Sequence, residues 1–224
     1  ALFAQLVTRV LSGGLKGASG PGSGDNAGVA TQLLEQSMGK QLADLRKQLT
    51  DSINNYYANT SRYIQLRQQA MDSISAVKNK YLTAKANFND KVGSTTQVTL
   101  SMPQITWARD QMAAIDTAIA TKVTPLENVY QVKLTDAKNR LITIQKLIRD
   151  ANSATTVETM QKVIQTFSSA VPTMTTEIDI SNAQSDLEIL QGLPPDQPGL
   201  LTPLDKEATE HLQRSKVFPN ILQM

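Results

Sequence analysis

The side chains that could perform chemistry are few and scattered. His211 is the single histidine, next to Glu210, and no HExxH or similar spacing surrounds it. A zinc site needs three or four converging ligands, and the chain has no Cys to supply them. A Ser-His-Asp triad would need this same histidine, and no G-x-S-x-G turn is present to hold a nucleophilic serine. We therefore predict a surface histidine, with no metal site and no nucleophilic catalysis.

Two further patterns could suggest an active site. Carboxylates pair as Glu127 with Asp136 and as Glu177 with Asp179, but acid–base catalysis needs a shielded cleft that shifts one pKa. On expected helix surfaces, i, i+4 pairing and first-turn placement account for them. The stretch "GPGSGDNAG" lacks the G-x-x-x-x-G-K-[ST] order of a phosphate-binding loop. The sequence thus predicts no catalytic residue, no cofactor-binding residue and no enzymatic activity.

Composition argues against a nucleic-acid-binding protein and favours a helical fold. The net charge is +2, from 22 basic and 20 acidic residues that are interleaved along the chain, so no basic cluster marks a nucleic-acid partner. Aromatic residues make up only 4%, and abundant Ala and Gln suit helix-on-helix packing better than a β-sandwich. The absence of Cys fits an exported bacterial protein. No apolar run reaches the ~20 residues that a membrane-spanning helix needs.

Apolar periodicity predicts an all-α fold, an elongated bundle of three or more long helices with smaller appended helices. Seven of the eleven glycines fall in residues 13–28, which we interpret as a Gly/Ser-rich linker before a bundle over residues 29–192. Two stripes with steps of three or four follow it: Leu34, Met38, Leu42, Leu45, Leu49, Ile53 and Tyr56, then Ile64, Met71, Ile74, Val77, Tyr81, Ala84 and Phe88. The sequence leaves open one helix or two over residues 29–92, and Asn59, Thr60 and Ser61 favour a break there.

The later boundaries are predicted from cap and proline signals. Gln97 to Leu100 suggests a loop with a short strand, and Thr106 caps the next helix. Thr124, Pro125 and Glu127 read as a new helix start with a capping box. The following stripes are Val129, Leu134, Ala137, Leu141, Ile144 and Ile148; then Val157, Met160, Ile164, Phe167 and Val171; then Ile178, Ala183, Leu187 and Leu190.

Turn and anchor signals complete the predicted bundle. Thr155 and Glu158 have the spacing of a second capping box. Pro172 kinks or restarts the chain, and Gly192 closes the last helix of the bundle. Residues 193–224 read as a Pro-rich C-terminal tail with a short helix over about Pro203 to Arg214. Trp107, the single Trp, is predicted to anchor neighbouring helices.

The first twelve residues form the candidate docking segment. One helical face carries six apolar residues, opposite Gln5, Thr8, Arg9 and Ser12; the six are Leu2, Phe3, Leu6, Val7, Val10 and Leu11. Twelve residues make only ~18 Å of helix, too short to span a bilayer, and such a helix is marginal alone in water. The chain begins with Ala, which we interpret as the mature end left after a signal peptide was removed. We expect residues 1–12 to dock on their own bundle, on another subunit or on a membrane surface.

One stretch of the sequence resembles a known family. In "NRLITIQKLIRDANSATTVETMQKVIQTFSSAVPTMTTEI", residues 139–178, the pair Leu147-Ile148 precedes the small polar turn "SATT", and Met160-Gln161-x-x-Ile164 follows. This pattern resembles the minor pilus subunit, or pilus-tip protein, of type IV secretion and conjugation systems. The resemblance implies an exported helical-bundle protein without a catalytic site, located in the periplasm or cell envelope or outside the cell on a pilus. It implies contacts with the major pilin and the polytopic inner-membrane component.

Together these observations predict a non-enzymatic structural or assembly subunit of a bacterial type IV secretion or conjugation apparatus. We expect it to form a homo-oligomer, to use no cofactor and to bind no nucleic acid. Two alternatives stay open on the sequence. One is a membrane-active helical protein, either a pore former or a lipid binder, that inserts residues 1–12. The other is a structural protein of a phage tail or virion.

Overall fold

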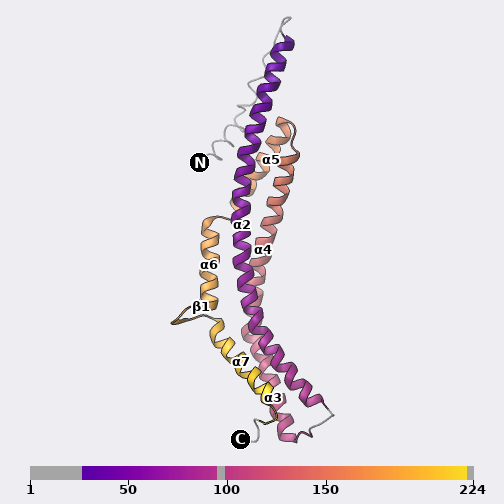
Figure 1. The fold of residues 1–224 in the computed structure, drawn as a ribbon, viewed down its shortest axis with the longest axis vertical. Coiled ribbons are helices and arrows are strands. Elements are labelled where there is room, and N and C mark those ends of the chain that lie inside the picture. The colour runs from indigo at the N-terminus through magenta and orange to yellow at the C-terminus, as the bar shows by residue number, and fades with distance from the viewer. Residues whose placement is uncertain (1–26, 95–98, 221–224) are drawn as a thin grey trace. The chain divides into compact units, whose positions relative to one another are not determined.

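The structure is a computed structural model that describes residues 27–94 and 99–220. Its helices are α2 (Ala27–Gly93), α3 (Met102–Ala118), α4 (Thr124–Ser153), α5 (Val157–Ala170), α6 (Glu177–Gln191) and α7 (Leu201–Val217), as labelled in Figure 1. Strands β1 (Gly192–Leu193) and β2 (Gln197–Pro198) pair antiparallel as a short hairpin. The predicted all-α bundle is confirmed. Residues 1–12 and most of the predicted linker lie outside the described residues.

The chain divides into two compact units. Unit 1 contains Ala1–Arg62 and Lys138–Glu177, and unit 2 contains Tyr63–Ala137 and Ile178–Met224. Helices α2 and α4 therefore each contribute one part to unit 1 and another part to unit 2. Each unit has a hydrophobic core of its own.

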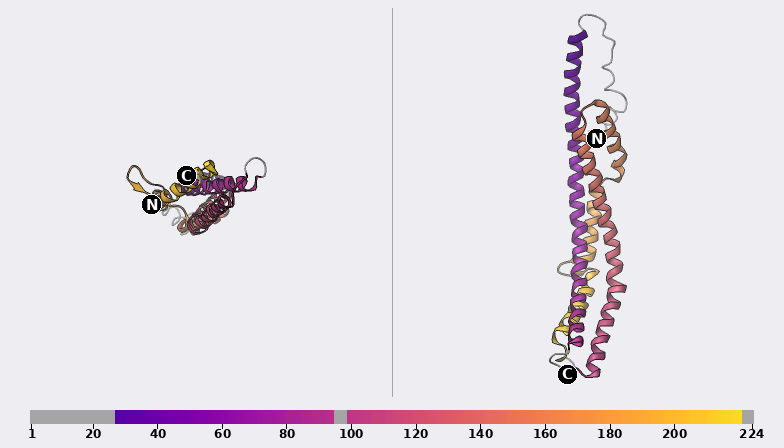
Figure 2. Two further views of the ribbon diagram at one scale, coloured as in Figure 1. Left: turned by 90° about the horizontal axis from the view of Figure 1, so that it is seen from below. Right: turned by 90° about the vertical axis from the view of Figure 1, so that its right-hand side faces the viewer.

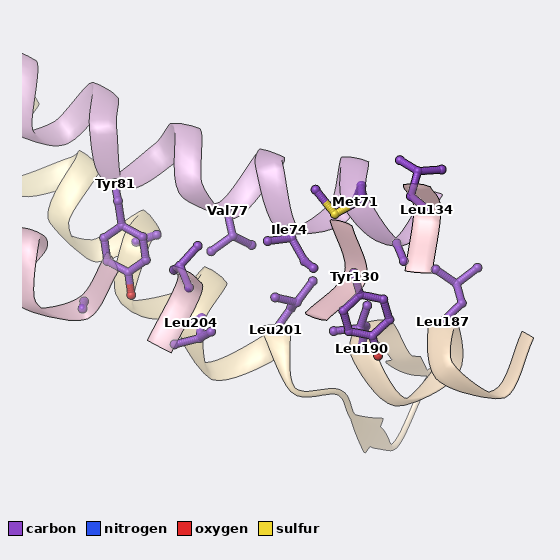
Figure 3. Packing of buried hydrophobic residues seen from close by; sticks show 14 of the residues in the cluster. Met71, Ile74, Val77, Tyr81, Tyr130, Leu134, Leu187, Leu190, Leu201 and Leu204 are labelled. Atoms are coloured by element: carbon purple, nitrogen blue, oxygen red, sulfur yellow. The ribbon is translucent and has the colours of Figure 1, made fainter. Parts of the chain in front are cut away.

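Unit 2 buries the second apolar stripe of α2 against α3, α4, α6 and α7. Figure 3 shows Met71, Ile74, Val77 and Tyr81 of α2 meeting residues of the other helices. Labelled partners in that view are Tyr130, Leu134, Leu187, Leu190, Leu201 and Leu204. Because these side chains recur every three or four residues on each helix, one face of each helix enters the core. The predicted stripe from Met71 to Phe88 is confirmed.

Unit 1 is built from the first stripe of α2, the end of α4, and α5, which turns back beside α4 (Figure 2, right). Leu45, Leu49 and Ile53 of α2 pack against Ile144 and Leu147 of α4 and against the buried face of α5, which presents Met160, Val163, Ile164 and Phe167. The rings of Tyr56 and Phe167 meet edge to face at 5.8 Å.

The expected break at Asn59–Ser61 is wrong, because α2 is one helix of 67 residues. Thr60 does not cap a helix. Its buried hydroxyl Oγ1 donates a hydrogen bond to Oγ1 of the equally buried Thr175 at 3.0 Å. Asn59 Nδ2 donates to the Thr175 carbonyl at 3.5 Å. Asn59 and Thr60 therefore make polar contacts with Thr175 inside unit 1 and form no turn. Tertiary packing overrides the preference of these residues for turns and caps.

The start of α3 also differs from the prediction. Ser101, rather than Thr106, is the N-cap: its hydroxyl accepts from the Gln104 backbone N–H, and the Gln104 side chain accepts from the Ser101 N–H. Pro103 lies in the first turn of α3, where its missing N–H removes no helical hydrogen bond. Half of the strand expected over Gln97–Leu100 lies outside the described residues, and Thr99 and Leu100 are irregular.

Helix α4 begins at Thr124, as predicted, but Thr124 does not cap it. A π-helical turn over Ile119–Val123 joins α3 to α4, and Thr124 has helical dihedral angles. The Thr124 N–H donates to the Ile119 carbonyl, five residues back. Proline lacks an N–H, and its ring crowds the carbonyl four residues earlier. The wider π-helical turn therefore lets the helix continue past Pro125. Glu127, expected in a capping box, instead pairs with Lys78 at 3.1 Å.

Smaller corrections concern α5 and two stripe residues. The N-cap of α5 is Thr156 with Thr159 at its third position, one residue after the predicted pair of Thr155 and Glu158. The apolar stripes predict buried positions for Val129 and Ile178, but these side chains are 51% and 71% exposed. On α4 the neighbouring Tyr130 takes the buried place instead.

The C-terminal region is more ordered than an extended tail with a short helix. Helix α7 has 17 residues, and Leu201, Leu204, Ala208, His211 and Ser215 are buried. Its end is capped from α2, because Lys91 Nζ donates to the carbonyl oxygens of Ser215, Lys216 and Phe218 at 2.5, 3.1 and 2.8 Å. A cation at the C-terminus of a helix satisfies free carbonyls and complements the helix dipole.

Trp107 anchors neighbouring helices, as predicted. Its ring stacks on Phe218 at 5.6 Å and meets Phe88 of α2 edge to face at 5.6 Å. Phe88 and Phe218 contact each other at 5.7 Å. These three rings join α2, α3 and the residue that follows α7.

Candidate functional site

The candidate site is an open hollow of unit 2 between α6, the hairpin and the start of α7. It has a volume of about 460 Å³. Ile189, Leu193 and Leu200 line it and are 55%, 46% and 50% exposed. Figure 1 shows the hairpin between α6 and α7, so residues from three consecutive elements meet here. We call this hollow the α6–α7 groove.

Two glycines shape the groove. Gly192 has φ +82°, a left-handed conformation that closes α6 as predicted and that favours glycine. At Gly199 a Cβ atom would lie 2.2 Å from the carbonyl oxygen of Leu190. The close approach lets the Leu200 N–H donate to the Ile189 carbonyl at 2.9 Å, while the Gly199 N–H donates to Thr202 Oγ1 at 2.9 Å. These contacts hold the start of α7 against the end of α6.

We expect Gly199→Ala to open this junction. The methyl group meets backbone atoms that cannot rotate away, so relief requires α7 to move, at a cost of about 1–3 kcal/mol of unfolding free energy. Hydrogen exchange at the Leu200 amide should speed up, because its bond to Ile189 lengthens. Gly93→Ala is the matched control, since nothing lies within 4 Å of a Cβ there. Equal exchange rates in the two variants would contradict the assigned role of Gly199.

Leu200 also lines a second hollow, which has a volume of about 410 Å³. Pro125, Leu126, Pro203 and Leu204 supply its apolar lining, and Lys122 and Glu207 supply its charges. Lys122 Nζ and Glu207 Oε2 lie 3.1 Å apart, so these charges neutralise each other. In the first hollow, Glu188 is the one charged lining residue. Ser185 and Gln197 are the uncharged polar lining residues of that hollow, and the remaining side chains of its lining are apolar.

Helix α6 is fixed to α2 and α4 by an ion-pair contact between the buried Arg67 and the partly exposed Asp186. Arg67 Nη1 of α2 donates to Asp186 Oδ2 at 2.5 Å, and Lys133 Nζ of α4 approaches the same oxygen at 3.3 Å. The Arg67 guanidinium also lies 4.9 Å from the centre of the Tyr63 ring. Burial disfavours the charge of Asp186, but the hydrogen bond from Arg67 and the charge of Lys133 outweigh it and lower the pKa of Asp186. Three helices of unit 2 are thus tied at one carboxylate.

His211 is buried rather than on the surface, so that prediction is wrong. It is 5% exposed, and its ring lies 6.0 Å from that of Tyr81 on α2. Nε2 lies 3.8 Å from Glu207 Oε1, and within the described ranges Nδ1 has no hydrogen-bond partner. Burial, helped by the charge of Arg214, lowers the pKa of His211 although Glu207 and Glu210 oppose the shift. The histidine is therefore a neutral core residue near neutral pH.

We expect unit 2 to lose stability as the pH falls below 6.5, the usual pKa of histidine. In that range the unfolded chain binds a proton that the folded chain resists, so acid favours unfolding. Urea unfolding followed by Trp107 fluorescence at about pH 7.5 and about pH 5.5 measures the effect. His211→Gln should reduce the change between the two pH values. A wild-type midpoint that does not depend on pH over this range would contradict the prediction.

All six residues predicted for docking lie outside the described residues: Leu2, Phe3, Leu6, Val7, Val10 and Leu11. Sequence reasoning missed the groove. Ile189 falls off the buried stripe of α6, and Leu193 and Leu200 stand in a Pro-rich stretch that suggested an extended tail. The pair Gly192 and Gly199, which bracket the hairpin, was the available signal for a tight turn with apolar flanks.

Three comparisons with known proteins, against family models, curated proteins and solved structures, found no match to the chain. Among the helices that the structure describes, none has the length and apolarity to cross a bilayer. In residues 27–94 and 99–220, no three or more His, Cys, Asp or Glu side chains are grouped as ligands of a metal ion.

Proposed function

We propose that the protein is a non-enzymatic assembly subunit of a bacterial type IV secretion or conjugation apparatus, a minor pilus component at the pilus tip or the assembly base. The observation that carries the proposal is the α6–α7 groove, a surface with three half-exposed aliphatic side chains. Exposed aliphatic side chains gathered at one hollow supply the kind of apolar surface that the centre of a protein–protein contact buries.

The use of charged side chains supports a structural role. Three ion pairs each connect different helices of unit 2: Arg67 with Asp186, Lys78 with Glu127, and Lys80 with Asp205. These charged side chains hold the helices together. Acid–base catalysis would instead need charged side chains that face a bound substrate. The resemblance over residues 139–178 adds to the proposal, since it falls on α4, α5 and the segment that leads into α6.

The proposal includes location and partners. The protein acts in the periplasm or cell envelope, or outside the cell on a pilus. It contacts the major pilin and the polytopic inner-membrane component, and it forms homo-oligomers. Residues 1–12 provide the docking element through the apolar face of Leu2, Phe3, Leu6, Val7, Val10 and Leu11.

Deletion of residues 1–12 tests this function in the native host. We expect the truncated protein to fold, with the circular dichroism and urea midpoint of the full chain, but to abolish assembly of the apparatus and its transfer activity. A variant with Gln5→Ala and Thr8→Ala on the polar face is the control and should assemble normally. Unimpaired assembly by the truncated protein would overturn the docking role.

Vesicle flotation separates protein docking from membrane docking. The purified full chain is mixed with vesicles of phosphatidylethanolamine and phosphatidylglycerol. We expect the chain to stay in the protein fraction at physiological salt. Strong flotation that depends on residues 1–12 would instead identify the membrane as their target and count against a subunit contact.

A further inference from the structure

We infer that the α6–α7 groove is the acceptor for residues 1–12 of a second copy of this chain. This inference rests on the proposed function and names the two surfaces that would meet in an oligomer. The acceptor is defined by Ile189, Leu193 and Leu200, which face the hollow from α6, β1 and the residue before α7. An amphipathic helix in an apolar groove is a recurrent mode of peptide recognition.

The two surfaces have complementary chemistry. Residues 1–12 contain six large apolar residues, and Arg9 is their one charged side chain. The groove is lined mainly by apolar groups, with Ser185 and Gln197 beside them, and Glu188 is its one charged side chain. Burying the apolar faces against each other removes both from water, and an Arg–Glu contact at the rim sets the orientation of the segment. A second groove of the same kind would repel, because it would bring two Glu188 carboxylates together.

The segment and the groove favour a contact between copies. Fourteen residues, rich in glycine, separate residue 12 from Ala27, the first described residue of α2. Fourteen residues can span at most about 46 Å, which is enough for a donor segment to reach a neighbouring molecule. The donor and acceptor surfaces are different, so one copy can give its segment and also receive one. Such a head-to-tail contact joins subunits in series, as an assembly subunit requires.

Cysteine cross-linking tests the contact directly, because the natural chain has no Cys. One preparation of the full chain carries Leu6→Cys and another carries Ile189→Cys, and the two are mixed under mild oxidation. We expect a disulfide-linked heterodimer of the two variants. The matched control is Ile178→Cys, a 71% exposed position on the same helix α6 outside the groove. The groove pair should give about tenfold more heterodimer than the control pair, since docking raises the effective concentration.

A charge exchange adds specificity to the test. Glu188→Lys should weaken self-association measured by sedimentation, and Arg9→Glu in the same chain should restore it. Equal cross-linking from Ile189 and Ile178, or a disulfide that forms only within a chain carrying both Leu6→Cys and Ile189→Cys, would overturn the inference.

The failure of this inference and the failure of the proposed function can be told apart. Loss of assembly on deleting residues 1–12, without a cross-link to Ile189, would overturn the groove contact and leave the subunit role in place. A strong cross-link in a protein that is absent from the apparatus would support the groove contact and overturn the proposed function.

Discussion

Asp186→Ala should lower the free energy of unfolding of unit 2 by about 3–5 kcal/mol, the usual effect of leaving a buried charge without its partner. Arg67 is 4% exposed and bonds to Asp186 at 2.5 Å. Without the carboxylate, the guanidinium stays in the core, where solvation cannot replace the lost contact. Urea unfolding followed by the fluorescence of Trp107, the single Trp and a residue of unit 2, measures the loss.

An exposed ion pair provides the control for this prediction. Lys85 and Asp116 lie 2.7 Å apart, but their side chains are 41% and 56% exposed, so Asp116→Ala should change stability by less than about 1 kcal/mol. Replacing both partners, as Arg67→Met with Asp186→Leu, should recover most of the loss, because no buried charge is then left alone. If Asp186→Ala and Asp116→Ala had equal effects, Arg67 would not be buried against Asp186 as described.

Phe88→Ala should remove about 3–5 kcal/mol of unfolding free energy from the same unit, as large-to-small changes at buried aromatics do. Phe88 is fully buried and its ring contacts both Trp107 and Phe218. The substitution leaves a cavity where α2, α3 and the residue after α7 meet. Trp107 emission should shift to longer wavelength in the folded variant, because water reaches the indole.

Leu82→Ala on the same helix is the comparison for Phe88→Ala. Leu82 is 42% exposed, and substitutions at such surface positions change stability by about 0.5 kcal/mol or less. A loss at Phe88 no larger than that at Leu82, with unchanged Trp107 emission, would show that the aromatic cluster does not form.

Much of the fold could be predicted because apolar periodicity is a strong signal on long helices. The stripe from Met71 to Phe88, the glycine cap at Gly192 and the anchoring role of Trp107 follow from residue type and spacing. The predicted helix boundaries are wrong where tertiary packing overrides a local cap or proline signal. Thr60 has the preferences of a cap but hydrogen-bonds Thr175 in a core, and Pro125 follows a π-helical turn that keeps the helix continuous.

Apolar periodicity alone does not predict the groove, for a physical reason. Periodicity identifies side chains that share a face, and Ile189, Leu193 and Leu200 share no face of one element. They meet only because Gly192 and Gly199 allow the chain to turn tightly and bring α7 against α6. In the same way, nothing near His211 in the sequence indicates that α7 turns this residue towards Tyr81.

Locating the protein on surface filaments by gold labelling is the most direct test of the proposed function. Surface filaments sheared from native cells would be labelled with gold-conjugated antibody against unit 2 and imaged by electron microscopy. The proposed function predicts label at filament tips or bases, and no filaments in a strain that lacks the gene. Filaments that form normally in that strain and carry no label in the wild type would contradict it.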